Sequence, residues 1–315
     1  MTKSLLAICT FNRKADLERL FTSLSVMNLF EVTILLIDAT QPNNSDYWDW
    51  AFSEQEKLSK LLSAPKIMWL QHKKGLTLQR NSALKFAHSG SFDFIHFIDD
   101  DVELHKDYFK YICEYFILNQ SCIGITGQRL GEYPQDLPVN QNIFSLIFSR
   151  ILRKINGTTA FGTVSPSGLN NMSYGDTILK IDWLSGCSMS YRLSGIKSNY
   201  FSEEFSDYSL MEDLDFSYSL NKSGQLFYIP NAKLTHHVSQ ANRWQYLKGL
   251  RIEAHNRTSF VFKHRDRLSI SRHVAGYILT IVRLSLQGLT KRKRLSESFA
   301  VLRGLTSGLC MRRYR

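Results

Sequence analysis

The sequence contains no long apolar run and few cysteines. Nowhere in its 315 residues do eighteen uncharged apolar residues follow one another, so no membrane-spanning helix is expected. The five cysteines are odd in number and widely spaced, which argues against a disulfide framework or a zinc site and favours a reducing cytosol. Residues 1–10 hold a short apolar stretch without a cleavage-site pattern, and this predicts a first strand rather than a secretory signal.

The composition is that of a folded protein with a charge imbalance at one end. A hydrophobic fraction of 43%, with 20 Phe and 14 Tyr, excludes a disordered chain. The length suits one large α/β domain with an appendage, or two small domains. Residues 263–315 hold thirteen Lys or Arg and two acidic residues, whereas residues 1–262 hold 26 of each sign. The whole net charge of +11 therefore belongs to the C-terminal tail.

The most informative stretch joins a strand-like segment to three carboxylates. Residues 94–98 are apolar except for His96, and Asp99, Asp100 and Asp101 follow them directly. Open α/β sheets bind ligands at the carboxyl ends of their strands. Adjacent carboxylates repel one another, and a divalent cation or hydrogen-bond donors offset that repulsion. Along an extended chain Asp99 and Asp101 point to one side and Asp100 to the other. A solvated acidic turn is the alternative for this triplet taken alone.

The N-terminal residues alternate between strand-like and helix-like patterns. The pattern predicts a strand, a turn, a helix and a second strand, at residues 4–9, 10–13, 15–24 and 32–37. Such a βαβ unit implies a parallel sheet with right-handed crossovers. A third strand is expected at 66–70, and a glycine turn and a helix through about residue 88 follow it. Basic residues near that helix start (Lys73, Lys74, Arg80) suit a phosphate, with a solvated basic turn as the alternative.

The second half of the chain contains an unusually long irregular segment. Residues 129–180 are rich in Asn, Gly, Ser and Pro and contain one basic amphipathic helix at about 143–155, which is typical of a functional loop or lid. Further strands and helices are expected on either side of it, at 106–119, 123–126, 183–192, 226–229 and 244–262. Gly186 lies in the expected strand 183–192, at a position where a ligand could approach the backbone.

A helix is expected from Ser209 to about Gly224, and two acidic residues lie at its start. Ser209 followed by Glu212 has the spacing of a capping box. That spacing allows a purely structural role for Glu212, which would bind the amide groups at the helix start. Asp213 has no such local role.

These motifs, in this order, resemble the glycosyltransferases of family 2 over residues 4–262. The resemblance rests on Cys9-Thr10-Phe11-Asn12-Arg13, Asp38, Gly75-Leu76 to Arg80-Asn81, the Asp triplet, Trp183 to Gly186, Glu212-Asp213, Pro230 to His236 and His255-Asn256-Arg257. It implies a GT-A fold, a doubly wound, mostly parallel α/β sheet, and the inverting transfer of a hexosyl or related sugar from a nucleotide diphosphate. After Asp38, Ala39-Thr40 departs from the family pattern, which makes the base and ribose contacts less certain.

The resemblance also implies roles for individual residues. It places the donor nucleotide against Thr10, Asn12, Arg13, Asp38, Arg80, Asp99, Asp100 and Gly186. Asp101 and Asp99, with His236, are the implied ligands of Mn²⁺ or Mg²⁺, a cation that would stabilise charge on the diphosphate leaving group. Inversion needs a carboxylate that takes the acceptor's proton. Asp213 is the first candidate for this base and Glu212 the second. The alternative for His236 is a structural role at the end of a strand, and a structural role is the expectation for His237.

Two other functions are alternatives to this one. A sugar nucleotidyltransferase would share the sheet and the metal carboxylates, but a glycine-rich basic loop normally follows its first strand, and Thr10-Phe11-Asn12 is not such a loop. A nucleic-acid-binding protein would explain the basic tail, yet the tail has no recognition motif. We therefore expect a nucleotide-sugar donor, a glycan or lipid-linked acceptor, a role in surface polysaccharide synthesis, and no nucleic acid.

The tail combines an apolar helix face with a cluster of positive charge. Ala275, Ile278, Leu279, Val282, Leu286 and Leu289 fall on one face, and Gly276, Thr280, Arg283 and Gln287 form a narrow polar stripe. The run Lys291 to Arg294 follows this helix. We expect a catalytic domain at 1–262 with 129–180 as its acceptor-side lid, and a tail at 263–315. Residues 268–315 of this tail would bind the anionic inner face of the cell membrane. The alternative is that the apolar face covers the core of the catalytic domain.

Overall fold

The computed structural model describes residues 2–29, 31–62, 66–131, 143–157, 160–197, 199–205, 210–237, 245–289 and 291–311. The chain divides into two compact units. One, here called the sheet unit, consists of Met1–Tyr133 and Ser173–Ala241. The other, here called the helical unit, consists of Pro134–Met172 and Asn242–Arg315. The division differs from the expected boundary at residue 262, because the preceding helix packs on the C-terminal helix and segment 134–172 also joins the helical unit.

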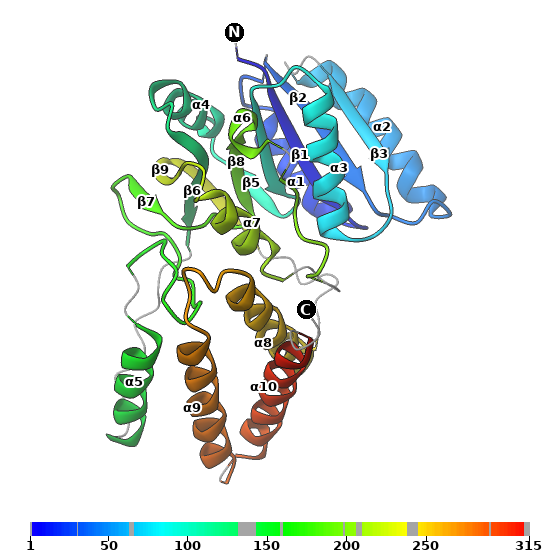
Figure 1. The fold of residues 1–315 in the computed structure, drawn as a ribbon. Helices are drawn as coiled ribbons and strands as arrows, with labels where there is room; N and C mark the ends of the chain where they lie inside the picture. The colour runs from blue at the N-terminus through cyan, green and yellow to red at the C-terminus, as the bar shows by residue number, and fades with distance from the viewer. Residues whose placement is uncertain are drawn as a thin grey trace. The chain divides into compact units, whose positions relative to one another are not determined.

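The sheet unit contains one mixed sheet in the order β3-β2-β1-β4-β8-β6-β9-β5, with β7 on β9 (Figure 1). Its strands are β1 (Ser4–Thr10), β2 (Val32–Asp38), β3 (Ile67–Gln71), β4 (Phe94–Asp99), β5 (Val102–Leu104), β6 (Cys122–Leu130), β7 (Leu179–Ile181), β8 (Ser188–Arg192) and β9 (Gln225–His236). The part from β3 to β4 is parallel, and β8 is antiparallel to both β4 and β6. This is the α/β architecture that the sequence predicts.

Helices cover both faces of the sheet. They are α1 (Lys14–Leu24), α2 (Ser45–Leu61), α3 (Leu76–Ser89), α4 (Tyr108–Leu118), α6 (Leu193–Ile196) and α7 (Glu212–Leu220). Successive residues of a strand point to opposite faces. In β1, Leu6 and Ile8 accordingly join a core with α1, α2 and α4, whereas Leu5 and Ala7 join a core with α3, α6 and α7. The carboxyl ends of the parallel strands, where sheets of this kind bind ligands, include Thr10 at the end of β1 and Asp99 at the end of β4.

Three local expectations in the sheet unit need correction. The strand expected at 183–192 forms only from Ser188 onward. The strand expected at 226–229 extends to His236 as β9. The expected capping box is wrong, because α7 begins at Glu212 itself after a left-handed Met211 with φ 77°, and the Glu212 carboxylate pairs with Arg80 instead. Ser209 lies outside the described residues.

The helical unit contains α5 (Ile143–Asn156), α8 (Tyr246–Lys263), α9 (Ile270–Gly288) and α10 (Arg292–Met311). Helix α10 packs on both α8 and α9. Its contact with α8 depends on a glycine, since a Cβ built on Gly304 would lie 2.2 Å from the carbonyl oxygen of Arg251. Among the helices in the described part of the chain, none is both long and apolar enough to cross a membrane.

Helix α9 has its polar stripe toward the inside of the helical unit. Gly276, Thr280 and Arg283 line a cavity of about 300 Å³, together with Glu253 and Glu297. Four of the six apolar side chains on the opposite face lie exposed, with exposed fractions from 43% to 83% for Ile278, Val282, Leu286 and Leu289. The apolar face of this helix is therefore not part of a core.

Candidate active site

The Asp triplet lies where β4 ends at the carboxyl edge of the sheet. Asp99 is the last residue of β4, and β5 begins directly after the triplet at Val102. Strand β5 pairs antiparallel with β9 in a register that sets Val102 opposite His236. Because of this register, a histidine 135 residues away in sequence lies beside Asp101.

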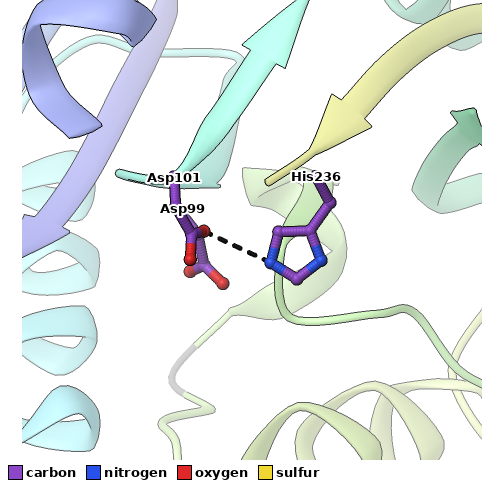
Figure 2. Close-up of side chains that lie close together, drawn as sticks. All are labelled: Asp99, Asp101 and His236. Atoms are coloured by element: carbon purple, nitrogen blue, oxygen red, sulfur yellow. Dashed lines mark ion pairs between the residues drawn. The ribbon is translucent and has the colours of Figure 1, made fainter. Parts of the chain in front are cut away.

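Asp99, Asp101 and His236 form a group that could hold a metal ion. One ligand atom from each lies within 4.8 Å of the others, and His236 Nε2 is 3.2 Å from Asp101 Oδ1. Figure 2 shows the two carboxylates and the imidazole turned toward one another. Metal–ligand bonds of about 2.1 Å place neighbouring ligand atoms roughly 3 to 4 Å apart, so the spacing fits a single cation. Two carboxylate oxygens and one imidazole nitrogen suit Mn²⁺ or Mg²⁺.

Asp100 lies apart from this group and contacts Arg13. Arg13 Nη1 donates to Asp100 Oδ1 at 2.8 Å and lies 3.3 Å from Asp101 Oδ2. Burial raises the pKa of Asp100 to about 7, and the Arg13 guanidinium opposes this rise. Arg13, at the start of α1, thus ties the nucleotide loop expected from the sequence to the acidic triplet.

Arg80 is enclosed by protein groups. Its side chain is 2% exposed. The guanidinium donates to the Glu212 carboxylate, to Asp99 Oδ1 at 3.1 Å and to the Gly186 carbonyl oxygen at 3.0 Å. The Arg80 guanidinium is thus buried and bound by three protein groups, which does not agree with the expected contact between Arg80 and a donor phosphate. Arg80 instead links the carboxylate at the end of β4 to helix α7.

The two base candidates lie side by side in different surroundings. Glu212 is buried on Arg80, and burial raises its pKa to about 8, with Asp213 adding to the rise and Arg80 opposing it. Asp213 is half-buried. Its Oδ2 accepts the backbone N–H of Gly186 at 2.7 Å and its Oδ1 accepts that of Leu214 at 2.7 Å. Two backbone donors thus orient the Asp213 carboxylate while part of it remains exposed to solvent.

Asp38 has a structural environment that the sequence did not reveal. It is fully buried, and its Oδ2 accepts from the Tyr47 hydroxyl at 2.6 Å and from Trp69 Nε1 at 2.9 Å. Its Oδ1 accepts from the backbone N–H of Thr40 at 2.8 Å. Because Asp38 is fully buried and both its oxygens accept from protein groups, it has no exposed atom for the contact with the nucleotide that the sequence predicts.

The loop between β1 and α1 contains the remaining expected donor residues. Thr10 is buried at the end of β1. Asn12 is exposed, has a left-handed backbone with φ 53°, and donates its N–H to Thr40 Oγ1 at 2.8 Å. Phe11 was not singled out from the sequence, but the Lys74 ammonium lies 4.1 Å from its ring centroid. The Lys73-Lys74 pair was the only sequence signal for this contact.

Two other expected motifs contain side chains with protein partners of their own. His237 Nε2 is 3.0 Å from Glu103 Oε2, which agrees with a structural role. Arg257, from the His255-Asn256-Arg257 motif, belongs to the helical unit. Its guanidinium donates to the Gly168 carbonyl oxygen at 2.8 Å and to Glu253 at 3.0 Å, so it holds part of segment 134–172 against α8.

This sheet, with a carboxylate cluster at the end of β4, is the GT-A architecture. The model of the family described as glycosyl transferase family 2 matches residues 6–176, more than half of the chain. The chain therefore belongs to glycosyl transferase family 2, and this membership favours glycosyl transfer over the two alternatives weighed above. No curated protein sequence matches the chain.

Solved structures share the fold at low sequence identity. The mannosyltransferase PcManGT from Pyrobaculum calidifontis, in complex with GDP-Man and Mn²⁺, is 10% identical with a TM-score of 0.56, covering 98% of this chain and 87% of that one. GalNAc-T7 with UDP, GalNAc and Mn²⁺ is 14% identical with a TM-score of 0.56, and the match covers 85% of this chain and 51% of that one. TarS 1-349 of S. aureus is 14% identical with a TM-score of 0.50, and the match covers 100% of this chain and 92% of that one. The chain spans 43% of a longer TarS structure.

Proposed function

We propose that this protein is an inverting glycosyltransferase that moves a sugar from a nucleotide diphosphate to a hydroxyl of a glycan or lipid-linked acceptor in surface polysaccharide synthesis. The observation that carries the proposal is the presence of a metal-type cluster at the end of β4 together with a half-buried, backbone-oriented carboxylate at Asp213. Two neighbours with a TM-score of 0.56 are complexes with Mn²⁺ and a nucleotide or nucleotide sugar, which supports this donor class.

In this proposal each residue has a defined task. Asp99, Asp101 and His236 would hold the divalent cation, which would supply positive charge to offset that of the leaving diphosphate. Thr10, Asn12 and Arg13 lie in the loop that would contact the nucleotide. Arg80 acts indirectly by holding Asp99 and Glu212 in place.

The proton transfer is assigned to Asp213. The bond between the anomeric carbon and the diphosphate oxygen breaks, the acceptor oxygen forms a bond to the same carbon from the opposite face, and the acceptor proton passes to the Asp213 carboxylate. Glu212 is a weaker candidate for this step because it is buried and paired with Arg80.

The test is a screen of nucleotide sugars with measurement of released nucleoside diphosphate. We expect release from one class of donor, stimulated by Mn²⁺ or Mg²⁺ and accelerated by the acceptor, and a product with inverted anomeric configuration by NMR. Release of pyrophosphate from a nucleoside triphosphate and a sugar phosphate, without any donor turnover, would contradict the proposal and indicate a nucleotidyltransferase.

We further propose that the helical unit contacts the cytoplasmic face of a cell membrane. The exposed apolar residues of α9 and the basic run Lys291 to Arg294 support this, because apolar burial and attraction to anionic lipid act together at a membrane surface. In flotation with anionic liposomes at low salt, the intact protein should rise with the lipid. A protein that stays in the soluble fraction would contradict the membrane contact and leave the transferase proposal intact.

A further inference from the structure

A groove of about 400 Å³ lies between α8 and α10, within the helical unit. It is separate from the charged cavity that the polar stripe of α9 lines, since the two have no lining residue in common. Lys248 and Arg251 of α8 and Arg303 of α10 supply its charged side chains, and Leu247 and Phe299 supply large apolar ones. No function described above uses this groove.

The charge of the groove has a single sign. Its lining contains three basic side chains and no carboxylate. The nearby acids face elsewhere, because Glu253 pairs with Arg257 and Glu297 is buried on Arg294, and both line the other cavity. Within the described residues, no carboxylate lies at ion-pair distance from Arg251 or Arg303. Cations gathered without a carboxylate among them favour an anionic ligand.

The same groove exposes apolar surface. Phe299 is 57% exposed and Leu247 is 40% exposed. Leu295 and Leu302, also exposed, continue the strip along α10 at helical spacing from Phe299. Free phosphate has no apolar part that such side chains could contact. A contiguous strip of exposed apolar side chains is typical of a surface that binds a partner or a ligand. The ligand is therefore expected to be amphipathic as well as anionic.

The two kinds of side chain are ordered along the groove. Gly304 contacts the backbone of Arg251, and Gly308 lies near Thr258, so the two helices run in the same direction and touch there. Arg251 and Arg303 lie at this close end. Leu247 and Phe299 lie one helical turn earlier on each helix. The groove thus has two arginines at one end and two large apolar side chains at the other.

We infer that this groove binds the headgroup of one anionic phospholipid, with Arg251 and Arg303 on the phosphate and an acyl chain along Leu247 and Phe299. The inference rests on the proposed membrane contact and adds a defined lipid position to it. Arginine suits the phosphate end because its planar guanidinium donates two parallel hydrogen bonds to phosphate oxygens.

The experiment titrates the full-length protein with soluble short-chain lipids and follows binding by calorimetry and native mass spectrometry. The probes are dioctanoyl-phosphatidylglycerol, dioctanoyl-phosphatidylcholine and glycerol 3-phosphate. We expect one bound phosphatidylglycerol per chain, at least about tenfold tighter than phosphatidylcholine, and much weaker binding of glycerol 3-phosphate. Equal affinity for the two lipids would overturn the inference, and glycerol 3-phosphate binding as tightly as the lipid would indicate a free-phosphate site instead.

Variants separate the two ends of the groove. The double variant Arg251→Glu with Arg303→Glu should lose the preference for phosphatidylglycerol. Phe299→Ser should bind both lipids more weakly and keep the preference. Lys85→Glu with Lys180→Glu, an equal charge change at exposed positions of the sheet unit, is the matched control and should bind as the unaltered protein does. If Arg251→Glu with Arg303→Glu lowers the midpoint temperature of unfolding, the binding experiment is done with Arg251→Gln and Arg303→Gln instead. If a folded double variant kept the preference for phosphatidylglycerol, the groove would not be the lipid site. No donor is present, so the result is independent of the transferase proposal.

Discussion

Gly186 and Asp213 are joined by a hydrogen bond of 2.7 Å from the glycine N–H to the carboxylate. The bond connects the segment before β8 with the first turn of α7, and it orients a carboxylate that is only half-buried. The Gly186 carbonyl oxygen accepts from Arg80, which also contacts Asp99. A single glycine therefore lies between the base candidate and the arginine that holds the metal-type cluster.

Replacing Gly186 with alanine should impair transfer while the protein stays folded. A Cβ at this position would lie 3.0 Å from Asp213 Oδ2 and 3.4 Å from Arg80 Nη2, so the carboxylate has to shift. We expect transfer to fall at least ~10-fold, with donor affinity changed little, because small displacements of a catalytic group are costly. Gly249→Ala is the control, since a Cβ there meets nothing within 4 Å. Equal rates for the two variants would show that the position of Asp213 does not limit the reaction.

Asp213→Asn should bind the donor and transfer at least ~100-fold more slowly, the usual scale for loss of a general base. The amide oxygen can still accept a backbone hydrogen bond, so the fold is expected to survive. Single-turnover transfer and donor titration measure the two effects separately. A nearly normal rate for Asp213→Asn together with an inactive Glu212→Gln would assign the base to Glu212.

Removal of the divalent cation should abolish turnover. EDTA is expected to stop transfer, and Mn²⁺ or Mg²⁺ to restore it, because the charge of the leaving diphosphate would otherwise be uncompensated. Asp101→Ala and His236→Ala should also weaken Mn²⁺ binding measured by calorimetry. His237→Ala is a close control, since that neighbouring side chain contacts Glu103 rather than the cluster. Full activity of Asp101→Ala in metal-free buffer would refute the metal requirement.

Stability should decrease on mild acidification because of His273. This side chain is buried between Thr258 and the Ser167 carbonyl oxygen, and burial lowers its pKa from 6.5 to about 4. The unfolded chain then binds more protons than the folded one between these values, so stability is complete above about pH 6.5 and is lost as the pH falls toward 4. The loss amounts to about 3 kcal/mol at most.

Unfolding midpoints at pH 7 and pH 5 measure this effect. His273→Gln, which cannot gain a proton, should show a smaller decrease between the two values than the unaltered protein. An identical decrease in both proteins would mean that His273 does not contribute to the acid sensitivity.

Features that depend on neighbours in sequence could be predicted from the sequence alone. The parallel strands, the helix after Gly75 and the position of the Asp triplet at a strand end follow from periodicity and turn residues, which act over a few residues. The side on which Asp99 and Asp101 project also follows from strand geometry. The motif order was enough to identify the family, which the family model then confirmed.

Features that depend on distant contacts could not be predicted in this way. Asp38 accepts hydrogen bonds from Tyr47 and Trp69, and Arg80 forms an ion pair with Glu212. A buried charged group is stable only when protein groups pair with it. The sequence does not reveal which distant residues those partners are. His236 lies beside Asp101 only through the register of β5 with β9. The sequence determined that α9 has an apolar and a polar face, and the tertiary structure decided which is exposed, since α8 and α10 surround a charged cavity that the polar stripe completes.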